Sequence, residues 1–404
     1  MITLADIEAA AARIRASIYV SPCAYSETYS RATGLRTYFK LENLQMTGSF
    51  KERGALNRLL LLSADERQRG VIAASAGNHA QGVAYHATRL GVHATIVMPE
   101  TTPLIKVVST REYGAEVVLH GANYDDACEE AQRLAGDRQL TFVHAFDDDA
   151  VIAGQGTIGL EILAQEPEVE VVVVPVGGGG LIGGIGCAIK TLRPSVRIIG
   201  VEPAGLPSAQ RAMTAGGPVT LAPAVTLADG IAVRRAGERT FPLLQRYVDD
   251  LVTVSEEELA NAVLLLLERE KTVAEGAGAA ALAAVVNGRV SIPLGKRTVM
   301  LVSGGNIDVN VLSRIIERGL AKDGRMLRLE VRISDSPGSL HALTGVFAAR
   351  RANVLDIGHL RAFSGVGLGE TVVELTLETR GVDHVQEILQ ALREAGYEHR
   401  RRML

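Results

Sequence analysis

Short apolar runs recur along the first three quarters of the chain, and stretches with the apolar spacing of a helix lie between them. The runs are rich in Val and Ile and are apolar on both faces, which is typical of parallel strands covered by helices on both sides. Strands are predicted at residues 71–75, 94–98, 116–119, 141–143, 171–176, 197–201, 251–254 and 298–303. Helices are predicted at residues 80–90, 104–112, 124–135, 155–164, 181–192, 256–270 and 306–319. This alternation predicts a doubly wound α/β core.

The pattern changes near the C-terminal end of the chain. From Leu327 apolar and polar residues alternate, so this strand is expected to have one face toward solvent. The elements that follow are a helix opened by residues 335–339, strands at 353–360 and 370–379, a helix at 383–395 and a short final strand. Their order is βαββαβ. We therefore predict a core domain at residues 1–322, a linker at 323–326 and a second domain at 327–404.

The composition is that of a soluble globular protein. The chain has 404 residues, of which 47% are hydrophobic and 22% charged, and its net charge is -4. Because there is no long basic run, neither nucleic acid nor a membrane surface is predicted as a partner. The cysteines lack metal-ligand spacing, and no apolar run reaches membrane-spanning length. We therefore expect a cytoplasmic protein without a metal site.

Lys51 is unusual for its position. In the stretch GSFKERGA, Gly48 and Ser49 are typical of a turn and a helix cap, so Lys51 is expected in the first helical turn. That end of a helix carries partial positive charge and favours carboxylates. The lysine could simply point into water. Alternatively, burial at this end lowers its pKa and keeps more of the amine neutral, which is the form that attacks a carbonyl group.

Four successive glycines follow one of the predicted buried strands. In PVGGGGLIGG, residues Gly177 to Gly180 precede a helix that is predicted to begin near Leu181. Residues without Cβ let several N–H groups converge, and the helix end adds its dipole, so the loop suits a phosphate. No Lys-Ser or Lys-Thr pair follows, which excludes a nucleotide-triphosphate loop. A flexible turn is the alternative, but four glycines after a core strand disfavour it.

Two further loops place polar groups at the carboxyl ends of predicted strands. SAGNHAQG begins at Ser75 and includes Asn78 and His79, and SGGN begins at Ser303. Ligands bind at this edge of open α/β sheets, so these loops, the glycine loop and the lysine predict one cleft. A phosphate cradle beside a reactive lysine suggests a phosphorylated carbonyl cofactor held as a Schiff base, and pyridoxal 5′-phosphate fits best.

The four motifs, in this order, resemble those of the fold-type II pyridoxal-phosphate enzymes, and within them the serine/threonine dehydratases. The resemblance covers residues 1–320, and residues 327–404 resemble an ACT domain, as in allosteric threonine ammonia-lyases. It implies a two-lobed, open, twisted parallel-sheet enzyme similar to the tryptophan synthase β chain, with a smaller lobe at roughly residues 48–150, and then a ferredoxin-like α+β domain. It also implies β-elimination of L-threonine to 2-oxobutanoate and ammonia, and of L-serine to pyruvate.

The resemblance also implies roles for individual residues. Lys51 is expected to bind the cofactor covalently and to act as the base, Phe50 to flank the cofactor ring, and Ser303 to face the pyridine nitrogen. Asn78 is expected to hydrogen-bond the 3′ oxygen. The cofactor phosphate is expected at Gly177, Gly178, Gly179, Gly180 and Leu181. The substrate carboxylate is expected on the loop of Ser75, Ala76, Gly77, Asn78 and His79.

Three positions qualify the resemblance. Serine racemases of the eukaryotic type have a serine at the position of Ala76, which acts on the second face of the substrate, so racemisation is expected to be weak here. Relatives with a divalent cation site have an aspartate six residues after the glutamate of VEP, whereas here Ser208 follows Glu202. Glu275 in AEGAGAA matches a position near the cofactor, but a carboxylate at a helix start has an equally good structural explanation.

The turn DSPGSL in the ACT-like region is the candidate effector site. Asp335, Ser336 and Ser339 lie between a predicted strand and helix, where free N–H groups can bind the carboxylate of an amino acid and Asp335 its amino group. An ordinary helix cap in a domain that only joins subunits is the alternative. Exposed sheet edges in a small domain favour pairing with a second copy, so a homo-oligomer, a dimer or a tetramer, is expected.

Other functions stay open on the sequence alone. A serine racemase and a serine-preferring dehydratase share these motifs, and a β-replacing synthase shares the fold but has a different asparagine loop and no ACT tail. A dehydrogenase would need a GxGxxG loop. A regulatory protein that only binds amino acids could have kept the fold, although all four cofactor motifs are present. The sequence does not separate isoleucine biosynthesis from threonine breakdown.

Overall fold

The computed structural model describes residues 1–360 and 367–402 of the chain. It divides the chain into two compact units, Met1–Ile307 and Asp308–Leu404. Helix α14 (Val309–Lys322) is the first element of the second unit and precedes the predicted linker at residues 323–326. The domain boundaries expected from the sequence thus stay predictions. Along the chain, the first compact unit ends at Ile307 and the second begins at Asp308.

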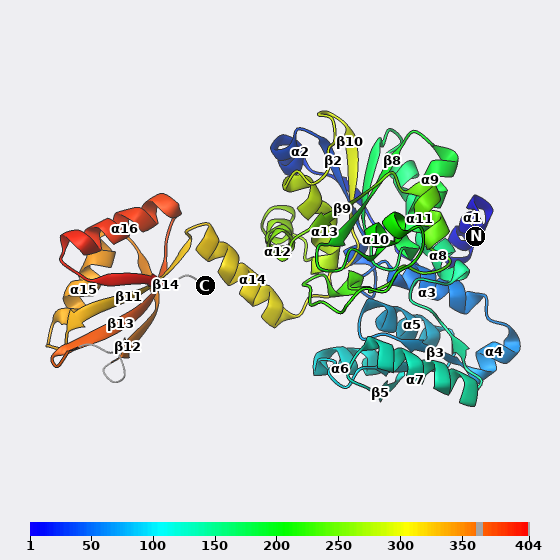
Figure 1. The fold of residues 1–404 in the computed structure, drawn as a ribbon, viewed down its shortest axis with the longest axis horizontal. Helices are drawn as coiled ribbons and strands as arrows, with labels where there is room; N and C mark the ends of the chain where they lie inside the picture. The colour runs from blue at the N-terminus through cyan, green and yellow to red at the C-terminus, as the bar shows by residue number, and fades with distance from the viewer. Residues whose placement is uncertain (361–366, 403–404) are drawn as a thin grey trace. The chain divides into compact units, whose positions relative to one another are not determined.

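The first unit contains two sheets (Figure 1). The larger has the order β1-β2-β10-β7-β8-β9, and every neighbouring pair is parallel except β1 with β2. Its strands are β1 (Cys23–Tyr25), β2 (Arg36–Leu41), β7 (Val171–Pro175), β8 (Arg197–Pro203), β9 (Asp250–Val254) and β10 (Arg297–Val302). We call this sheet with its helices the large lobe. The predicted strands at 171–176, 197–201, 251–254 and 298–303 are confirmed, whereas β1 and β2 were not predicted.

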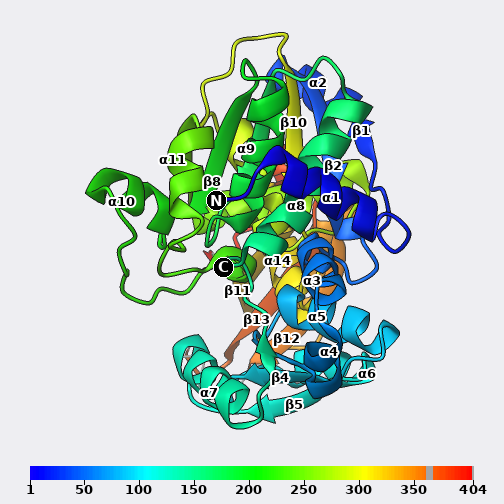
Figure 2. The same cartoon turned by 90° about the vertical axis from the view of Figure 1, so that its right-hand side faces the viewer.

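The second sheet of this unit is fully parallel, with the order β5-β4-β3-β6. Its strands are β3 (Val71–Ala74), β4 (Ala94–Met98), β5 (Glu116–Leu119) and β6 (Thr141–Phe142). Val71 and Ala73 pack with residues of α5 (Asn78–Arg89), whereas Ile72 and Ala74 pack with residues of α7 (Tyr124–Asp137), so helices cover both faces (Figure 2). We call this sheet with α5, α6 and α7 the small lobe. The two-lobed, open parallel-sheet fold that the resemblance implied is confirmed.

The helices predicted at residues 80–90, 104–112, 124–135 and 181–192 are confirmed, the one predicted at 155–164 begins earlier, at Asp149, and others, such as the helix at 276–286, were not predicted. Thirteen α-helices lie in the first unit, all of whose residues the structure describes. They are α1 (Leu4–Ile14), α2 (Glu27–Thr33), α3 (Lys51–Leu60), α4 (Ala64–Arg69), α5 (Asn78–Arg89), α6 (Leu104–Glu112), α7 (Tyr124–Asp137), α8 (Asp149–Gln165), α9 (Gly180–Leu192), α10 (Ser208–Ala215), α11 (Phe241–Tyr247), α12 (Glu256–Leu265) and α13 (Gly276–Val286). Short helical turns occur at η1 (Glu42–Leu44) and η2 (Asp229–Ile231), and the turn η3 (Leu266–Glu270) is π-helical. The helix predicted at 256–270 therefore ends as α12 and continues as this π turn.

Arg53 ties α3 to the large lobe. Its side chain is 1% exposed, and its guanidinium donates to Glu42 at 2.8 Å and to Glu161 of α8 at 2.6 Å. Lys40 of β2, which is fully buried, also donates to Glu161, at 2.5 Å. Buried charges are stable only when they are paired in this way, so these ion pairs fix the position of α3 on the large lobe.

The second unit is a four-stranded antiparallel sheet with two helices after α14. Its elements are β11 (Met326–Ser334), α15 (Ser339–Ala349), β12 (Asn353–Leu360), β13 (Glu370–Glu378), α16 (Val382–Glu394) and β14 (His399–Arg402). The sheet order β12-β13-β11-β14 is that of a ferredoxin-like fold. As the alternation predicts, the apolar residues of β11 are buried and form the core with α15 and α16.

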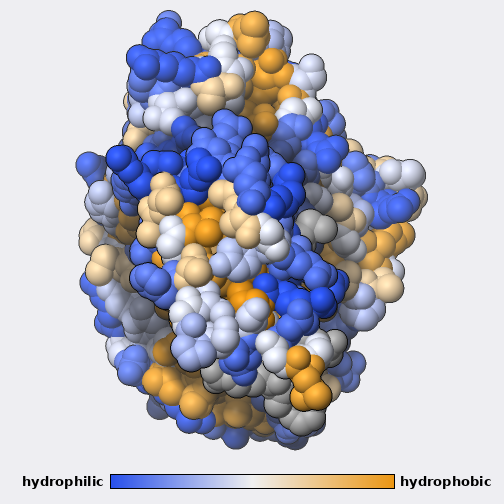
Figure 3. Space-filling view, turned by 90° about the vertical axis from the view of Figure 1, so that its left-hand side faces the viewer, coloured by the Kyte–Doolittle hydropathy of each residue, from blue (hydrophilic) through white to orange (hydrophobic). Residues whose placement is uncertain are grey.

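The surface shows no broad apolar band on the face drawn in Figure 3, where hydrophobic side chains lie in small, separate groups among hydrophilic ones. No helix in the described part of the chain has the length and apolar character needed to cross a membrane.

Candidate active site

Lys51 is the first residue of α3, in the helical turn where the sequence places it. The residue at the cap position is Phe50, not Ser49, and no side chain caps the helix. The prediction that Ser49 caps α3 is therefore wrong: Ser49 instead forms a β-bridge with Gly304, and its hydroxyl is buried without a partner among the described residues. This bridge brings the lysine loop against the SGGN loop.

Lys51 is half-buried, with its amine directed inward. Burial lowers its pKa to about 8, and the Glu275 carboxyl acts in the opposite direction. The amine donates a hydrogen bond to the Ala145 carbonyl at 2.9 Å and lies 5.2 Å from the centre of the Phe50 ring. A lysine with this pKa is partly neutral near neutral pH, as a nucleophile or a base requires.

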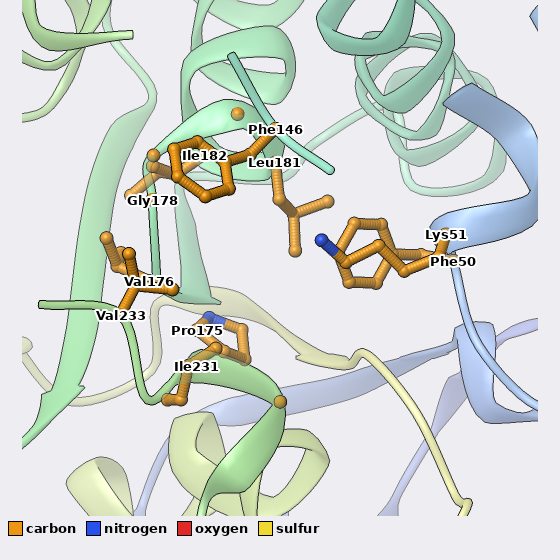
Figure 4. A pocket seen from close by; sticks show the side chains of 14 residues that line it. Phe50, Lys51, Phe146, Pro175, Val176, Gly178, Leu181, Ile182, Ile231 and Val233 are labelled. Carbon is orange, nitrogen blue, oxygen red and sulfur yellow. The ribbon is translucent and has the colours of Figure 1, made fainter. Parts of the chain in front are cut away.

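A pocket opens in front of this amine (Figure 4). The amine points into it between Phe50 and Leu181. The pocket is lined by Phe50, Lys51, Phe146, Pro175, Val176, Gly177, Gly178, Gly179, Gly180, Leu181, Ile182, Gly230, Ile231 and Val233. The structure thus brings the predicted lysine, its neighbouring phenylalanine and the complete glycine loop together.

Phe146 explains part of the glycine loop and was missed by the sequence analysis. A Cβ on Gly178 would lie 2.3 Å from the Phe146 ring, and one on Gly180 would lie 2.7 Å from the Phe146 carbonyl oxygen. The loop that carries Phe146 also holds the lysine, through Ala145. His144 orders this loop, because its Nδ1 accepts the N–H groups of Phe146 and Asp147. The available signal was its position just after a short predicted strand.

Asn78 and Glu275 form a buried pair beside the pocket. The amide Nδ2 of Asn78 donates to Glu275 Oε1 at 2.7 Å, and its Oδ1 accepts from Asn306 Nδ2 at 2.8 Å. Burial raises the pKa of Glu275 to about 7, and the nearby Asp229 adds to this shift. Glu275 occupies the cap position of α13 but makes no capping hydrogen bond, so its carboxyl serves Asn78 rather than the helix.

The loop of residues Ser75 to His79 lies at the start of α5, and Ser303 lies just after β10, outside the immediate lining of the pocket. Gly77 donates its N–H to the Ser75 hydroxyl at 3.2 Å, and Ala76 is half-buried. His79 Nε2 donates to the Val143 carbonyl at 2.9 Å, and burial lowers the pKa of His79 to about 3. A Cβ on Gly304, next to Ser303, would lie 3.1 Å from Asn78 Nδ2, which places these two motifs side by side.

Comparison with known proteins decides the family. Residues 14–304 match the family model described as pyridoxal-phosphate dependent enzyme. The chain belongs to this family. It is 50% identical to an L-threonine ammonia-lyase of Thermotoga maritima over 400 residues, which cover 99% of each chain.

Solved structures of similar proteins support the same family. The processed form of threonine deaminase isoform 2 from Solanum lycopersicum has a TM-score of 0.74 and 39% identity, covering 78% of this chain and 91% of that one. Maize serine racemase has a TM-score of 0.74 and 32% identity, covering 79% and 98%. The resemblance to fold-type II enzymes of the serine/threonine dehydratase group is therefore confirmed, as is the predicted cofactor.

The pocket of this pyridoxal-phosphate enzyme fits its cofactor on its own geometry. Among the described residues, no group accepts a hydrogen bond from the backbone N–H of Gly177, Gly178 or Gly179. Buried N–H groups without partners are costly, so they need acceptors. A phosphate supplies acceptor oxygens and negative charge at the N-terminal end of α9, where the helix dipole favours an anion.

Glu202 of this enzyme is used as a helix cap. Its two carboxylate oxygens accept the N–H groups of Ala209 at 2.7 Å and Gln210 at 2.9 Å, in the first turn of α10. Burial raises the pKa of Glu202 to about 7. In the described residues no group of three or more His, Cys, Asp or Glu side chains could hold a metal ion.

The predicted effector residues lie in the second unit, at the turn between β11 and α15. The hydroxyls of Ser336 and Ser339 lie 2.9 Å apart, and the N–H of Asp335 donates to the Gly369 carbonyl at 2.8 Å. Gly338 precedes α15 with a left-handed backbone, φ 89°, and no side chain caps the helix. The three residues are thus neighbours: Asp335 and Ser336 are exposed in the turn, and Ser339, the first residue of α15, is half-buried.

Proposed function

We propose that this enzyme is an L-threonine ammonia-lyase that converts L-threonine to 2-oxobutanoate and ammonia, and L-serine to pyruvate and ammonia. The observation that carries this proposal is the Lys51 amine, whose pKa is lowered by burial to about 8 and which faces the glycine loop across one pocket. The Thermotoga maritima relative, at 50% identity over almost the whole chain, supports the choice of substrate.

The residues of the pocket divide the work. When bound, pyridoxal phosphate supplies an electrophilic carbon and a ring that accepts electron density. Lys51 Nζ holds the cofactor covalently between turnovers and takes the proton from the α carbon of the substrate. The N–H groups from Gly177 to Leu181 bind the phosphate, and Phe50 supports one face of the ring.

Two further groups orient the ring. Asn78 Nδ2 donates one of its two hydrogens to Glu275, so the second can be donated to the 3′ oxygen of the cofactor. Ser303 presents a hydroxyl, rather than a carboxylate, to the ring nitrogen. A hydroxyl there would not keep that nitrogen protonated, so the bound ring would withdraw less electron density, which would favour net loss of the α proton and the β-hydroxyl of the substrate together as water.

The substrate is bound at the start of α5. The first N–H groups of a helix have no partner within it, so those near Asn78 and His79 can receive the substrate carboxylate. Neutral His79 donates to Val143, which fixes the loop. The product of elimination from threonine, aminocrotonate, then takes up water and gives 2-oxobutanoate and ammonia.

Two measurements test the activity. Steady-state rates with L-threonine and L-serine should show turnover of both, and borohydride reduction followed by peptide mass analysis should find the cofactor on Lys51. Lys51→Ala should lose at least about 1,000-fold in kcat but stay folded, since the residue is both attachment point and base. Attachment at another lysine, or undiminished turnover of this variant, would overturn the assignment.

We further propose that residues 327–404 are an ACT domain that binds an amino-acid effector at Asp335, Ser336 and Ser339, in a homo-oligomer. The ferredoxin-like sheet order and the exposed edge strands support pairing with a second copy. Removal of residues 327–404 should leave deamination intact and abolish any response to isoleucine or valine. A truncated enzyme that keeps the full response would place the effector site in the first unit.

A further inference from the structure

One segment of the large lobe touches both halves of the candidate active site. In this wall segment, residues 229–234, three residues line the pocket: Gly230, Ile231 and Val233. A Cβ on Gly177 would lie 3.1 Å from Ile231 Cα, and one on Gly230 would lie 3.0 Å from Glu275 Oε1. The wall segment therefore packs on the phosphate loop on one side and on the carboxyl that holds Asn78 on the other.

This wall segment is joined to the small lobe at both of its ends. Lys106 Nζ, on α6, lies 2.8 Å from Asp229 Oδ2. Arg234 pairs with Asp125, which lies in the first turn of α7. Arg234 also donates to the Leu221 carbonyl at 2.8 Å, so its guanidinium is held within the large lobe.

Exposed ion pairs usually contribute little, and this is the simplest explanation of both contacts. The placement of these two ion pairs nevertheless indicates a role in positioning the wall segment. Both pairs cross between the two lobes, and both end on the same six-residue stretch, which has a single short helical turn, η2, of its own. By contrast, the pair Arg133–Asp137 lies within α7 and joins nothing to the pocket.

The electrostatics at Glu275 agree with this placement. Burial is the main reason that the pKa of Glu275 is raised to about 7. Asp229 raises this pKa further and Lys106 lowers it, so the two partners act on the carboxyl with opposite signs. While Lys106 and Asp229 stay paired beside it, their opposite effects on the pKa of Glu275 partly cancel.

We propose that the ion pairs Lys106–Asp229 and Asp125–Arg234 hold the wall segment in place, and with it the side of the pocket formed by Gly230, Ile231 and Val233. The four residues are positioning residues and do not touch the reacting atoms. Substrate affinity should depend on them, whereas the chemical step on the bound substrate should depend on them much less.

The test uses charge reversal and charge exchange in the full-length holoenzyme. Lys106→Glu and Asp229→Lys break one pair, the double variant restores it with opposite polarity, and Asp125→Asn weakens the other. Arg133→Glu is the matched control, because its two ion pairs, with Glu130 and Asp137, both lie within α7. Two quantities are measured: KM and kcat for L-threonine, and hydrogen–deuterium exchange of the backbone amides of residues 229–234.

Each single reversal should raise KM about threefold to tenfold, change kcat less than about twofold, and speed exchange in the wall segment, and the double variant should return to within about twofold of wild type. Asp125→Asn should show a smaller shift of the same kind, and Arg133→Glu none. Wild-type KM and exchange in both single variants, or a double variant no better than the singles, would overturn the proposal. The KM readout rests on the proposed function. An enzyme inactive on threonine would refute that function, and exchange would still decide the role of the pairs.

Discussion

The helices that begin at the pocket or directly beside it start differently from most helices elsewhere in the described part of the chain. At α3, α5, α9 and α13, the cap positions are held by Phe50, Gly77, Gly179 and Glu275, and none of these side chains caps its helix. In contrast, α1, α2, α4, α7, α8, α12 and α14 each begin with a Thr, Ser, Asn or Asp side chain that accepts a backbone N–H. A cap adds stability but occupies donors, so the pocket keeps donors free where ligands bind.

The start of α15, in the second unit, shares the open form but not the packing. Gly338 has φ 89° and Gly179 has φ 93°, so both turns use a left-handed glycine. A Cβ on Gly179 would lie 3.0 Å from Thr240, whereas one on Gly338 would have no atom within 4 Å. The pocket turn is thus fixed by its surroundings, and the α15 turn is open to a partner or ligand.

The largest expected effect comes from adding one methyl group to the packed turn. Gly178→Ala should destabilise the protein by about 3 kcal/mol or more and weaken cofactor binding, because the Cβ would lie 2.3 Å from the Phe146 ring. Gly338→Ala should cost only about 1 to 2 kcal/mol, from its left-handed backbone. Urea unfolding and cofactor titration measure both. Equal losses in the two variants would contradict the difference between the turns.

The next effect concerns α10, whose cap is Glu202 on a neighbouring strand. Because burial raises the pKa of this carboxyl from 4.5 to about 7, the folded state keeps a proton that the unfolded state has lost between these pH values. The unfolding free energy of wild type should therefore fall, relative to Glu202→Gln, by about 1 to 2 kcal/mol as pH rises from 5 to 8. Denaturation at several pH values measures this difference. Titration of the buried histidines is common to both proteins and cancels.

A side-chain cap away from the pocket should affect stability alone. Ser255 accepts the N–H of Glu258 at the start of α12, in a capping box. Ser255→Ala should lower the unfolding free energy by about 1 kcal/mol and leave kcat/KM for threonine unchanged. Chemical denaturation and steady-state kinetics on the same preparations test this. A matching loss of activity would erase the distinction between the two classes of helix start.

The smallest expected effect is a gain of side activity at the start of α5. Ala76→Ser should introduce slow racemisation of L-serine, since a hydroxyl there can supply a proton on the face opposite Lys51. Chiral chromatography of D-serine measures it. If wild type already racemises serine as fast as it deaminates it, the role assigned to position 76 is wrong.

The strands β3, β4, β7 and β10 were found from the sequence because they are buried on both faces, and a run such as VVVVPV has only one stable environment. Strand β2 was missed because its buried Lys40 is paired with Glu161, a contact between residues 121 positions apart that no local pattern contains. Helix α13 was missed because it is apolar on all sides and rich in Gly and Ala, so it has no amphipathic period.

The candidate site divides in the same way. Lys51 and the glycine loop were found because their local chemistry is unusual for a helix start and for the end of a strand. Phe146 and the bond between Asn78 and Glu275 depend on which loops the fold brings together, and the latter two residues are 197 positions apart. Local chemistry therefore identifies reactive groups, whereas their supports require the fold.

The buried ion pair between Arg53 and Glu161 has a consequence for the order of folding and cofactor binding. The helix that carries Lys51 is anchored by a guanidinium whose partner Glu161 lies 108 positions away, so the anchor forms only after that long loop has closed. A nascent or partly refolded chain therefore has its lysine but not the site around it. The absorbance of the bound cofactor should therefore appear during refolding after the large lobe has assembled, not before. Cofactor absorbance thus reports on the last stage of folding.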